Sequence, residues 1–513
     1  MRRSRRERKT GKTVAKIVHN LPGSKTNTIL PPTLGPPGFT FLDNTRIDQL
    51  RERTFSLLEE HGVFICHEKA VKALNKAGAR VESDGQRVYF PRSLVEQAIK
   101  DTPKSVTLFG KTQEWDHDLP NPGGKFIMRT GTGAHGFVDG ETGNYRKLVM
   151  ADVATIAAVG NHLDQIGFIS HPFVNGVPER TSDIHGFAEL MSLTPKHVWI
   201  QPYETENVEY LMRICALAAG GEAALRERPI ASCIATSFTP LELKQMDVEA
   251  IIQASRHGMA IHACSLPTAG GTAPITMPGA VVLAAAEILS MLVLNQIVGS
   301  GTAVIATPLI FALDMRTGKS LQSSTEVLQG VSMSLQLMKQ GFGLLTHTYG
   351  SGSDTPDVDS QSNAERSLLG QLVALSGADI LGGVGQLECA TVFSPVQAVI
   401  DNEIGQMLQN YLRTPKIDDE SFAWELLKNI PQGGNFLANQ HTLKHCRATL
   451  DPHVFLRQAR DTYEAENRRN AQDNARDIFR NILNKDPLPG LPDETTVREI
   501  KKMVKAGDAN ILD

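Results

Sequence analysis

The sequence predicts an α/β protein built on a (β/α)8 barrel of the TIM type, with an N-terminal cap and a helical C-terminal extension. From about residue 125, short runs of β-branched and apolar residues alternate with runs that have the apolar spacing of amphipathic helices. Eight such units follow one another within about 280 residues. This number matches a closed barrel, whereas a doubly wound open sheet usually has about five to seven strands.

The predicted elements of the barrel follow a regular order along the chain. The first strand is followed by a glycine-rich hairpin at 139–143, and later strands are followed by helices such as 241–256 and 326–339. The eight predicted strands are 126–131, 166–171, 197–202, 230–236, 259–265, 303–307, 343–348 and 378–384.

The barrel is expected to occupy only part of the chain. Residues 1–40 read as a basic, proline-rich lead-in, and residues 41–120 as a cap made of a helix, a small hairpin and a second helix. The barrel takes residues 121–414, and a charged, mostly helical extension takes 415–513. The arginines near the N-terminus favour a solvated tail or an oligomer arm over a nucleic-acid patch.

Composition restricts the class of protein. A net charge of -4 at pH 7 and a charged fraction of 21% are typical of a soluble globular protein and argue against general nucleic-acid binding. The six cysteines lie far apart without a CxxC pair, which favours a reducing compartment over a disulfide framework. No apolar stretch follows the basic N-terminus, so a secretory signal is not expected. We therefore expect a cytoplasmic protein.

The most apolar stretch, residues 280–294, reads as a buried helix and not as a membrane span. It has about 15 residues with Glu287 in its middle, whereas a span needs about 20 apolar residues. A helix that is apolar nearly all round must be covered on every side. We expect it to pack on the barrel with one side and on another subunit of a homo-oligomer with the other.

In a barrel of this kind the active site lies at the carboxyl ends of the strands. Aromatic faces there suit an alkylammonium ion, each contributing about 0.5–2 kcal/mol when desolvated, with ordinary packing as the alternative. The aromatic residues after predicted strand ends are Phe173, Tyr203, Phe238, Phe311 and Tyr349. The cationic and imidazole residues at or just beyond strand ends are Arg129, His171, Arg316 and His347.

Metal ligands give only weak signals. His262 and Cys264 alternate onto one face of the fifth strand and, with Cys389, have the donor types of a zinc site, but histidines and free cysteines are frequent in barrel cores. His441 and His445 stand one helical turn apart without the glutamate that a zincin motif requires. We therefore expect no resident metal.

Cofactor fingerprints also fail. The glycines of 131–136 have dinucleotide-site spacing but lead into a hairpin, and 382–385 lacks the third glycine. Residues 183–188 approach the Asp-x-His-x-x-Gly pattern of cobalamin-binding chains but have Ala188 at the decisive position. The sequence therefore indicates no nucleotide cofactor and no corrinoid bound by this chain itself.

Several segments together carry a resemblance to a known family. They are 270–276 with the helix through Glu287, 314–318, 380–385, and 433–437 with 441–445. In order and spacing they resemble the trimethylamine methyltransferase family over nearly the whole chain. The resemblance is to its branch without pyrrolysine, which includes glycine betaine:corrinoid methyltransferases.

The resemblance implies a (β/α)8 barrel that docks a separate corrinoid protein over its open end and passes a methyl group to Co(I). The family's pyrrolysine would fall near residues 354–356, where only standard residues stand. The chain is therefore expected to demethylate a small quaternary amine. Glycine betaine is favoured, proline betaine, carnitine and butyrobetaine are further candidates, and trimethylamine is not expected.

A quaternary amine suits this chemistry because methyl transfer releases a neutral tertiary amine, so no general acid is needed. For a betaine the carboxylate needs a donor, and we rank His347 and Arg316 before Arg129 and His171. Two other classes stay open. One is a zinc-dependent barrel enzyme that methylates a thiol, and the other is a protein that binds quaternary amines without catalysis.

Overall fold

The computed structural model describes residues 39–83, 85–121, 125–448 and 450–512. Two compact units are present. Among the described residues, 414–448 and 450–451 belong to one unit, and residues 39–413 together with 452–512 belong to the other. The second unit contains the barrel and is described first.

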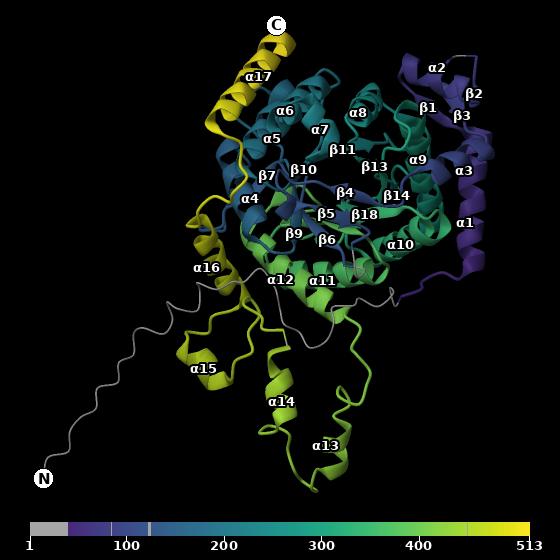
Figure 1. Ribbon diagram of the computed structural model, residues 1–513. Helices are drawn as coiled ribbons and strands as arrows, with labels where there is room; N and C mark the ends of the chain where they lie inside the picture. Colours follow the sequence, from purple (N-terminus) through teal and green to yellow (C-terminus); the bar gives the residue numbers. More distant parts are fainter. Residues whose placement is uncertain (1–38, 84, 122–124, 449, 513) are drawn as a thin grey trace, which may run out of the picture. The chain divides into compact units, whose positions relative to one another are not determined.

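Eight parallel strands close into a barrel, as predicted. Their order around the barrel is β10-β11-β13-β15-β18-β19-β6-β9 (Figure 1). All eight predicted strands are confirmed, with ends shifted by at most two residues. The strands are β6 (Ile127–Thr130), β9 (Ile166–Ser170), β10 (His197–Ile200), β11 (Ala231–Thr236), β13 (Ile261–Ser265), β15 (Val304–Pro308), β18 (Leu345–Tyr349) and β19 (Ile380–Val384).

Helices surround the strands because each has an apolar side that the barrel can bury. In α8, for example, Val248, Ile251 and Ala254 recur at helical spacing and are fully buried. Side chains of Ser324, Asp359 and Ser394 cap the amino ends of α10, α11 and α12. The helices are α4 (Met150–His162), α5 (Ser182–Leu193), α6 (Asn207–Ala219), α7 (Glu222–Glu227), α8 (Gln245–Arg256), α9 (Met277–Val298), α10 (Thr325–Gln336), α11 (Ser360–Leu375) and α12 (Pro395–Tyr411).

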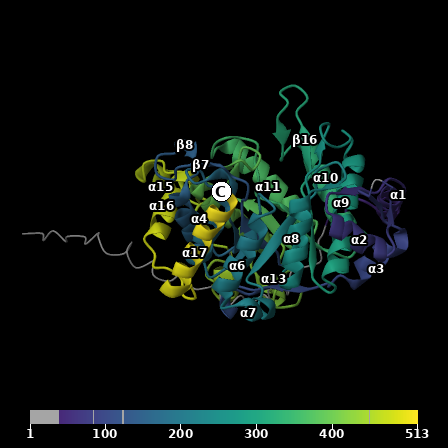
Figure 2. The same ribbon diagram turned by 90° about the horizontal axis from the view of Figure 1, so that it is seen from above.

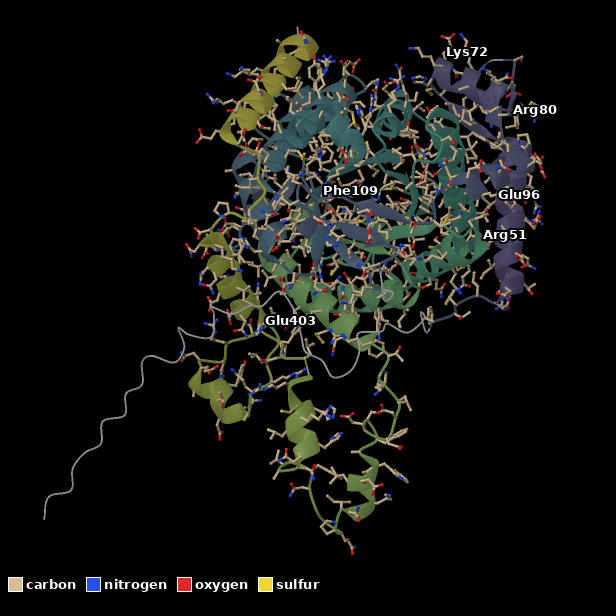
Figure 3. The ribbon with its side chains drawn as sticks, in the orientation of Figure 1. Arg51, Lys72, Arg80, Glu96, Phe109 and Glu403 are labelled. Carbon is tan, nitrogen blue, oxygen red and sulfur yellow. The ribbon has the colours of Figure 1, made fainter. Side chains whose placement is uncertain are left out.

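The amino-terminal end of the barrel is closed by a hairpin. The antiparallel strands β4 (Val106–Leu108) and β5 (His117–Leu119) lie in front of the barrel in Figure 1. Leu108 and Leu119 belong to the same apolar cluster as the barrel side chains. Phe109 lies across the centre of the barrel in Figure 3, and its carbonyl accepts a hydrogen bond from His197 Nδ1 at 2.8 Å. Residues of the chain itself therefore fill this end.

Small sheets extend the barrel at its carboxyl-terminal end. One sheet has the order β20-β21-β7-β8 and another β14-β16-β17. In Figure 2, β7, β8 and β16 lie on the same side of the barrel. The strands are β7 (Gly136–Val138), β8 (Tyr145–Lys147), β14 (Thr268–Ala269), β16 (Phe311–Leu313), β17 (Ser320–Leu321), β20 (Gln386–Leu387) and β21 (Val392–Phe393).

The N-terminal cap contains more elements than predicted. A helix, α2 (Glu68–Lys76), stands between the first strand of the cap and its hairpin. The hairpin strands pair in a sheet of order β12-β1-β3-β2, in which β12 (Glu242–Leu243) comes from the loop after β11. The other cap elements are α1 (Asn44–Ser56), the π-helical turn Leu57–His61, β1 (Val63–Ile65), β2 (Arg80–Val81), β3 (Arg87–Tyr89) and α3 (Arg92–Asp101).

Helix α9 is the one described helix with the length and hydropathy of a membrane span, but 83% of its most apolar window is buried inside the protein. Its inner side packs on β13 and β15, and its outer side packs on α1, α2 and α3. The expectation that another subunit covers this helix is therefore wrong. The chain's own N-terminal cap supplies the apolar cover that the helix requires.

The C-terminal extension is divided between the two units. In the barrel unit, α16 (Ala471–Leu483) packs on α12 and α4, and α17 (Glu494–Leu512) packs on α6 and α5, while α15 (Arg460–Ala465) is short. The other unit holds α13 (Trp424–Asn429), α14 (Gln440–His445) and the 3-10 turn Cys446–Ala448. Within its described residues, no side chain is buried.

Candidate active site

The middle of the barrel is filled by aromatic and imidazole rings. Trp199 of β10, His262 of β13 and His347 of β18 point inward from alternate positions of their strands. The ring centroids of each pair among these three are 5.2 or 5.3 Å apart. His262 Nε2 is 3.0 Å from Ser232 Oγ of β11. This layer forms the floor beneath the carboxyl-terminal mouth.

A fully buried guanidinium belongs to the same layer. Arg129 of β6 stacks on Trp199, with Cζ 3.8 Å from the ring centroid, and Cζ is 5.6 Å from the ring centroid of Tyr349. Arg129 Nη1 donates to Thr130 O at 2.8 Å and to Ser170 Oγ at 3.3 Å. Burial lowers the pKa of Arg129 to about 10, so the group stays cationic at neutral pH. None of its hydrogen-bond acceptors is a carboxylate.

The protonation state of His347 follows from its hydrogen bond to Arg129. Arg129 Nε donates to His347 Nε2 at 2.8 Å. An arginine N–H can only donate, so Nε2 must accept and carries no proton. Burial, followed by the nearby Arg129 charge, holds the pKa of His347 well below its usual range. The neutral ring therefore carries its proton on Nδ1, which has no partner among the described residues.

A cavity of about 390 Å³ lies at the carboxyl ends of β10 and β11. Inward-pointing Ile234 and Thr236 of β11 line it, next to Gln201, which accepts a hydrogen bond from Thr132 Oγ1 at 2.7 Å. The first turn of α8 forms the opposite wall. The remaining lining residues are Pro202, Tyr203, Ser237, Phe238, Lys244, Met246 and Asp247.

Asp247 gives this cavity a carboxylate without a cationic partner. The residue is only 6% exposed, and its Oδ1 accepts a hydrogen bond from Thr236 N at 2.6 Å. Burial raises the pKa of Asp247 to about 6. Within the described part of the chain no lysine, arginine or histidine pairs with it, and the neighbouring Lys244 pairs with Glu242 instead. Sequence reasoning missed Asp247, because this residue lies on a helix and not at a strand end.

The aromatic candidates form two groups instead of one cage. Tyr203 and Phe238 both line the cavity. Phe173 stacks on Tyr203, with centroids 3.9 Å apart and an interplanar angle of 5°, so one face of each ring is already covered. Phe311 and Tyr349 meet edge to face at 6.3 Å, beside the ends of β15 and β18. The Phe238 ring is 58% exposed and has Lys244 Nζ 4.3 Å from its centroid, so the rim of the cavity reaches the surface.

Two further residues predicted from the sequence differ in burial: His171 is buried and Arg316 is exposed. His171 is buried beneath this wall, with its ring centroid 5.9 Å from that of Tyr203, and burial lowers its pKa to about 4. Both of its ring nitrogens lack a partner among the described residues. Arg316 stands at the turn between β16 and β17, with a side chain 91% exposed, and among the described residues its ion-pair partner is Asp314, at 3.8 Å. The structure therefore does not bring Arg316 into contact with His347.

The loop that carries Tyr203 is held by a buried carboxyl group. Asp183, in the first turn of α5, accepts hydrogen bonds from Tyr203 N at 2.8 Å and from Asn207 Nδ2 at 2.7 Å. Burial raises the pKa of Asp183 to about 7. The segment 183–188, weighed above as a cobalamin motif, lies in α5, and its first residue positions the cavity wall.

Metal-ligand geometry gives no support to the zinc alternative. Within the described ranges, no three histidine, cysteine, aspartate or glutamate residues are grouped so that they could hold a metal ion. The thiol of Cys264 lies in the barrel core, where burial holds its pKa far above the usual range and disfavours the thiolate that a zinc ion requires. His441 and His445 stack with centroids 4.3 Å apart in the other unit.

A closed barrel with a charged, aromatic cavity at the carboxyl ends of its strands is the arrangement of a barrel enzyme that acts on a small molecule. Comparison with known proteins identifies the class more closely. The model of the trimethylamine methyltransferase family matches residues 2–510. The chain therefore belongs to this family of methyltransferases, as the resemblance in the sequence predicted.

Relatives in the family match most of the chain at low identity. It is 28% identical to the trimethylamine methyltransferase of Desulfitobacterium hafniense strain DCB-2, covering 88% of this chain and 91% of that protein. It is 27% identical to a glycine betaine methyltransferase of Desulfitobacterium hafniense strain Y51, covering 84% and 89%. The crystal structure of the Methanosarcina barkeri monomethylamine methyltransferase aligns over 90% of this chain and 92% of that one, with a TM-score of 0.46 and 12% identity.

Proposed function

We propose that this protein transfers a methyl group from a small quaternary amine to the Co(I) of a separate corrinoid protein. Glycine betaine is the first candidate for the donor, and proline betaine, carnitine and butyrobetaine are the others. The observation that carries the proposal is the mouth cavity, which combines aromatic faces with the unpaired carboxylate of Asp247. Membership of the trimethylamine methyltransferase family supports the reaction type.

The cavity suits a permanent cation for two physical reasons. A quaternary ammonium ion has no N–H to donate, so aromatic faces and a nearby negative charge are the groups that can hold it. Tyr203 and Phe238 offer the faces, and Phe173 fixes the Tyr203 ring by stacking on it. Asp247 offers the charge, and a bound cation would favour its ionised form.

Lys244 would compete with the donor cation for the face of the Phe238 ring. Its ammonium group occupies the face of Phe238 and pairs with Glu242. A donor cation that reaches Phe238 must displace Lys244, which is half exposed and therefore free to turn toward solvent. Phe311, Tyr349 and His171 stand farther from the cavity lining. We assign them to the surrounding wall of the donor site.

The reaction requires orientation more than acid–base chemistry. The amine that leaves a quaternary nitrogen is neutral, so no residue has to give it a proton. Attack on the methyl group neutralises the donor's charge, and a cavity that excludes water favours that change relative to the solvated reactants. The partner's corrinoid supplies the nucleophile. The residues of this chain hold the ammonium end and point one N-methyl group out of the mouth.

The partner and the compartment belong to the same proposal. The amino-terminal end of the barrel is closed by β4 and β5, so the corrinoid protein would dock over the carboxyl-terminal mouth, where Phe238 is exposed. Cys66, Cys215, Cys233, Cys264 and Cys389 carry free thiols. Co(I) chemistry and free thiols both favour a reducing cytoplasm.

The test is an anaerobic methyl-transfer assay. Purified protein and Co(I)alamin are mixed with each of the four betaines named above, and with trimethylamine and dimethylamine, while methylcobalamin formation is followed. We expect turnover of at least one quaternary amine and none of the tertiary or secondary amines. Turnover of trimethylamine at a rate equal to or above every betaine would contradict the proposal. Binding of a betaine without any transfer would identify a non-catalytic binder.

A further inference from the structure

The barrel interior holds a buried positive charge that the protein does not neutralise. Two arginine side chains of the described chain are among its largest fully buried groups. Arg366 is paired with Asp401, with Nη1 2.8 Å from Oδ2, and both side chains are at most 1% exposed. Arg129 is equally buried, but it donates to the neutral groups His347 Nε2, Thr130 O and Ser170 Oγ, and the neutral hydroxyl of Tyr349 lies beside it. One of the two buried guanidinium groups therefore lacks an anion.

The imbalance matters because buried charges in proteins are almost always paired. Stacking on Trp199 attracts the cation by the face of the ring but leaves the net charge in place. The three neutral acceptors bond only part of the guanidinium. Nη2, with its two hydrogens, has no partner among the described residues.

Further unpaired hydrogen-bond donors lie in the same layer as Arg129. Trp199 Nε1 and His347 Nδ1 are buried and lack partners. The indole nitrogen can only donate, and the bond from Arg129 to His347 Nε2 leaves Nδ1 as a donor too. The layer therefore presents three kinds of unpaired N–H group together with one positive charge. It contains no unpaired anion to match them.

We propose that Arg129, together with His347 and Trp199, binds the carboxylate of a ligand, and that this carboxylate is the anionic end of the methyl donor. The inference rests on the proposed function and names the residues that hold the carboxylate shared by its four candidate donors. It assigns the carboxylate to Arg129 in place of the exposed Arg316.

Two arguments favour a carboxylate from the donor. A guanidinium and a carboxylate are both planar and form paired, charge-assisted hydrogen bonds. In addition, the site has one unpaired negative charge, on Asp247, and one unpaired positive charge, on Arg129, which match the ammonium and the carboxylate of a zwitterion. Gln201 lines the cavity directly after β10, and Trp199, on which Arg129 stacks, stands two residues earlier, within β10. An ammonium end beside Asp247 and a carboxylate end toward Arg129 would satisfy both unpaired charges.

The experiment measures binding without any corrinoid, so that no transfer takes place. Glycine betaine, butyrobetaine, choline and acetate are titrated calorimetrically into wild-type protein. Choline keeps the trimethylammonium group and lacks the carboxylate. We expect at least one betaine to bind about ten- to a hundredfold more tightly than choline, as a charge-assisted hydrogen bond in a dry site predicts. Equal affinity for choline and both betaines would overturn the inference.

Variants locate the carboxylate site. Arg129→Met should remove the preference for betaine over choline, and Arg129→Lys should reduce it at least tenfold, because lysine lacks the planar fork. Arg213→Met on the outer helix α6 serves as the matched control and should keep the preference. Loss of the preference in Arg316→Met, with the preference kept in a folded Arg129 variant, would overturn the assignment.

Failure of this inference can be told from failure of the proposed function. If the wild-type protein demethylates a betaine and folded Arg129 variants do so with unchanged kcat/KM and unchanged preference over choline, only the inference fails. If the wild-type protein binds neither choline nor any betaine, the proposed function fails with it. If neither Arg129 variant folds, the wild-type comparison of betaine with choline still decides.

Discussion

At the scale of single residues, the tautomer of His347 decides what the barrel interior offers to a ligand. Its Nε2 is committed as an acceptor to Arg129 Nε, at 2.8 Å, and its Nδ1 faces the interior as a donor. A substitution that keeps an acceptor for Arg129 Nε but changes the donor at the position of Nδ1 can therefore separate these two roles of His347.

His347→Gln should retain the acceptor for Arg129, whereas His347→Phe keeps a ring of similar size and removes it. Leaving the Arg129 N–H unpaired in a dry core should cost about 1–3 kcal/mol of folding stability in the Phe variant. The Gln variant should lose less. Urea denaturation measures the difference, and betaine turnover should fall about ten- to a hundredfold in the Phe variant. Equal stability of the two variants would contradict the assigned hydrogen bond.

Asp183 predicts a dependence of stability on pH. Its pKa is about 7 in the folded protein, raised by burial above the ordinary aspartate value of 3.8. Between these two values the folded state binds more protons than the unfolded state, so stability falls as the pH rises through this window. This difference between the pKa of the folded and the unfolded state corresponds to at most about 4 kcal/mol of folding stability.

Asp183→Asn should therefore lack this part of the pH dependence. Near pH 4 it should be less stable than the wild type, because an amide can accept hydrogen bonds only through its one oxygen, whereas three donors point at Asp183. The gap should narrow toward pH 8. Urea denaturation of both proteins from pH 4 to pH 8 gives the two curves, and parallel curves would show that Asp183 does not titrate in this range.

Single residues also show why the sequence predicts only part of the site. Arg129, His347 and Tyr203 could be chosen because they stand at or beside strand ends, and the topology of a barrel brings such ends together. Asp247 could not be chosen in this way, since it reaches the cavity from the first turn of α8. Arg316 follows a strand as well, but its strand β16 is part of a hairpin that carries the side chain into solvent.

At the scale of elements, Glu287 joins the core helix α9 to the loops above the barrel. Its carboxylate accepts hydrogen bonds from Ser237 Oγ and Ser265 Oγ, each at 2.5 Å, from Thr239 Oγ1 at 2.9 Å and from Leu241 N at 2.8 Å. Three of these donors follow β11, and Ser265 is the last residue of β13. A charged residue inside an apolar helix thus fixes the loop that carries Phe238.

Glu287→Ala should destabilise the protein by about 3–5 kcal/mol, because four buried donors lose their acceptor together. Glu287→Gln keeps the shape and one carbonyl oxygen, so its loss should be clearly smaller. Thermal or urea unfolding measures both. For a donor bound against Phe238, the Gln variant should raise KM more than it lowers kcat. An unchanged stability of Glu287→Ala would show that these loops do not depend on the helix.

The elements that the sequence predicts are those with strong periodicity. The eight barrel strands are buried on both faces and alternate with amphipathic helices, so their existence is predictable, while their ends shift by a few residues. The two- and three-residue strands of the small sheets form only where tertiary structure brings a partner alongside. The same holds for β12, which pairs with β1 through residues 178 positions apart, such as Phe64 with Glu242. Such pairings leave no periodic signal.

At the scale of the whole molecule, the absence of a cobalamin motif predicts how the purified protein behaves. The segment that most resembles that motif, 183–188, lies in α5. There Asp183 accepts a hydrogen bond from Tyr203 N, and His185 is hydrogen-bonded to Asp508. We expect the isolated protein to be colourless and to require added corrinoid, free or protein-bound, for methyl transfer. Absorption spectroscopy and the assay without added Co(I)alamin check this. A stoichiometric cobalamin spectrum in the protein as isolated would contradict it.

The segment 414–451 leads to the prediction of a homo-oligomer. It contains two short helices but no buried side chain among its described residues, and large apolar groups are exposed along it. Those most exposed are Ile417 (70%), Leu437 (84%) and Leu443 (68%), with Trp424 at 51%. Helices of six residues are not stable in water without packing, and an apolar surface of this kind marks a contact with another chain.

A permanent contact suits a second copy of the chain better than a corrinoid partner, because that partner must leave to give up its methyl group in every cycle. We therefore expect light scattering coupled to size-exclusion chromatography to give a mass of at least twice 55.9 kDa. The double variant Leu437→Glu/Leu443→Glu should reduce that mass, since charges are costly in an apolar interface. Leu512→Glu, which is 44% exposed on α17 in the barrel unit, is the control and should keep it. A monomeric wild-type protein would rule out this reading of the segment.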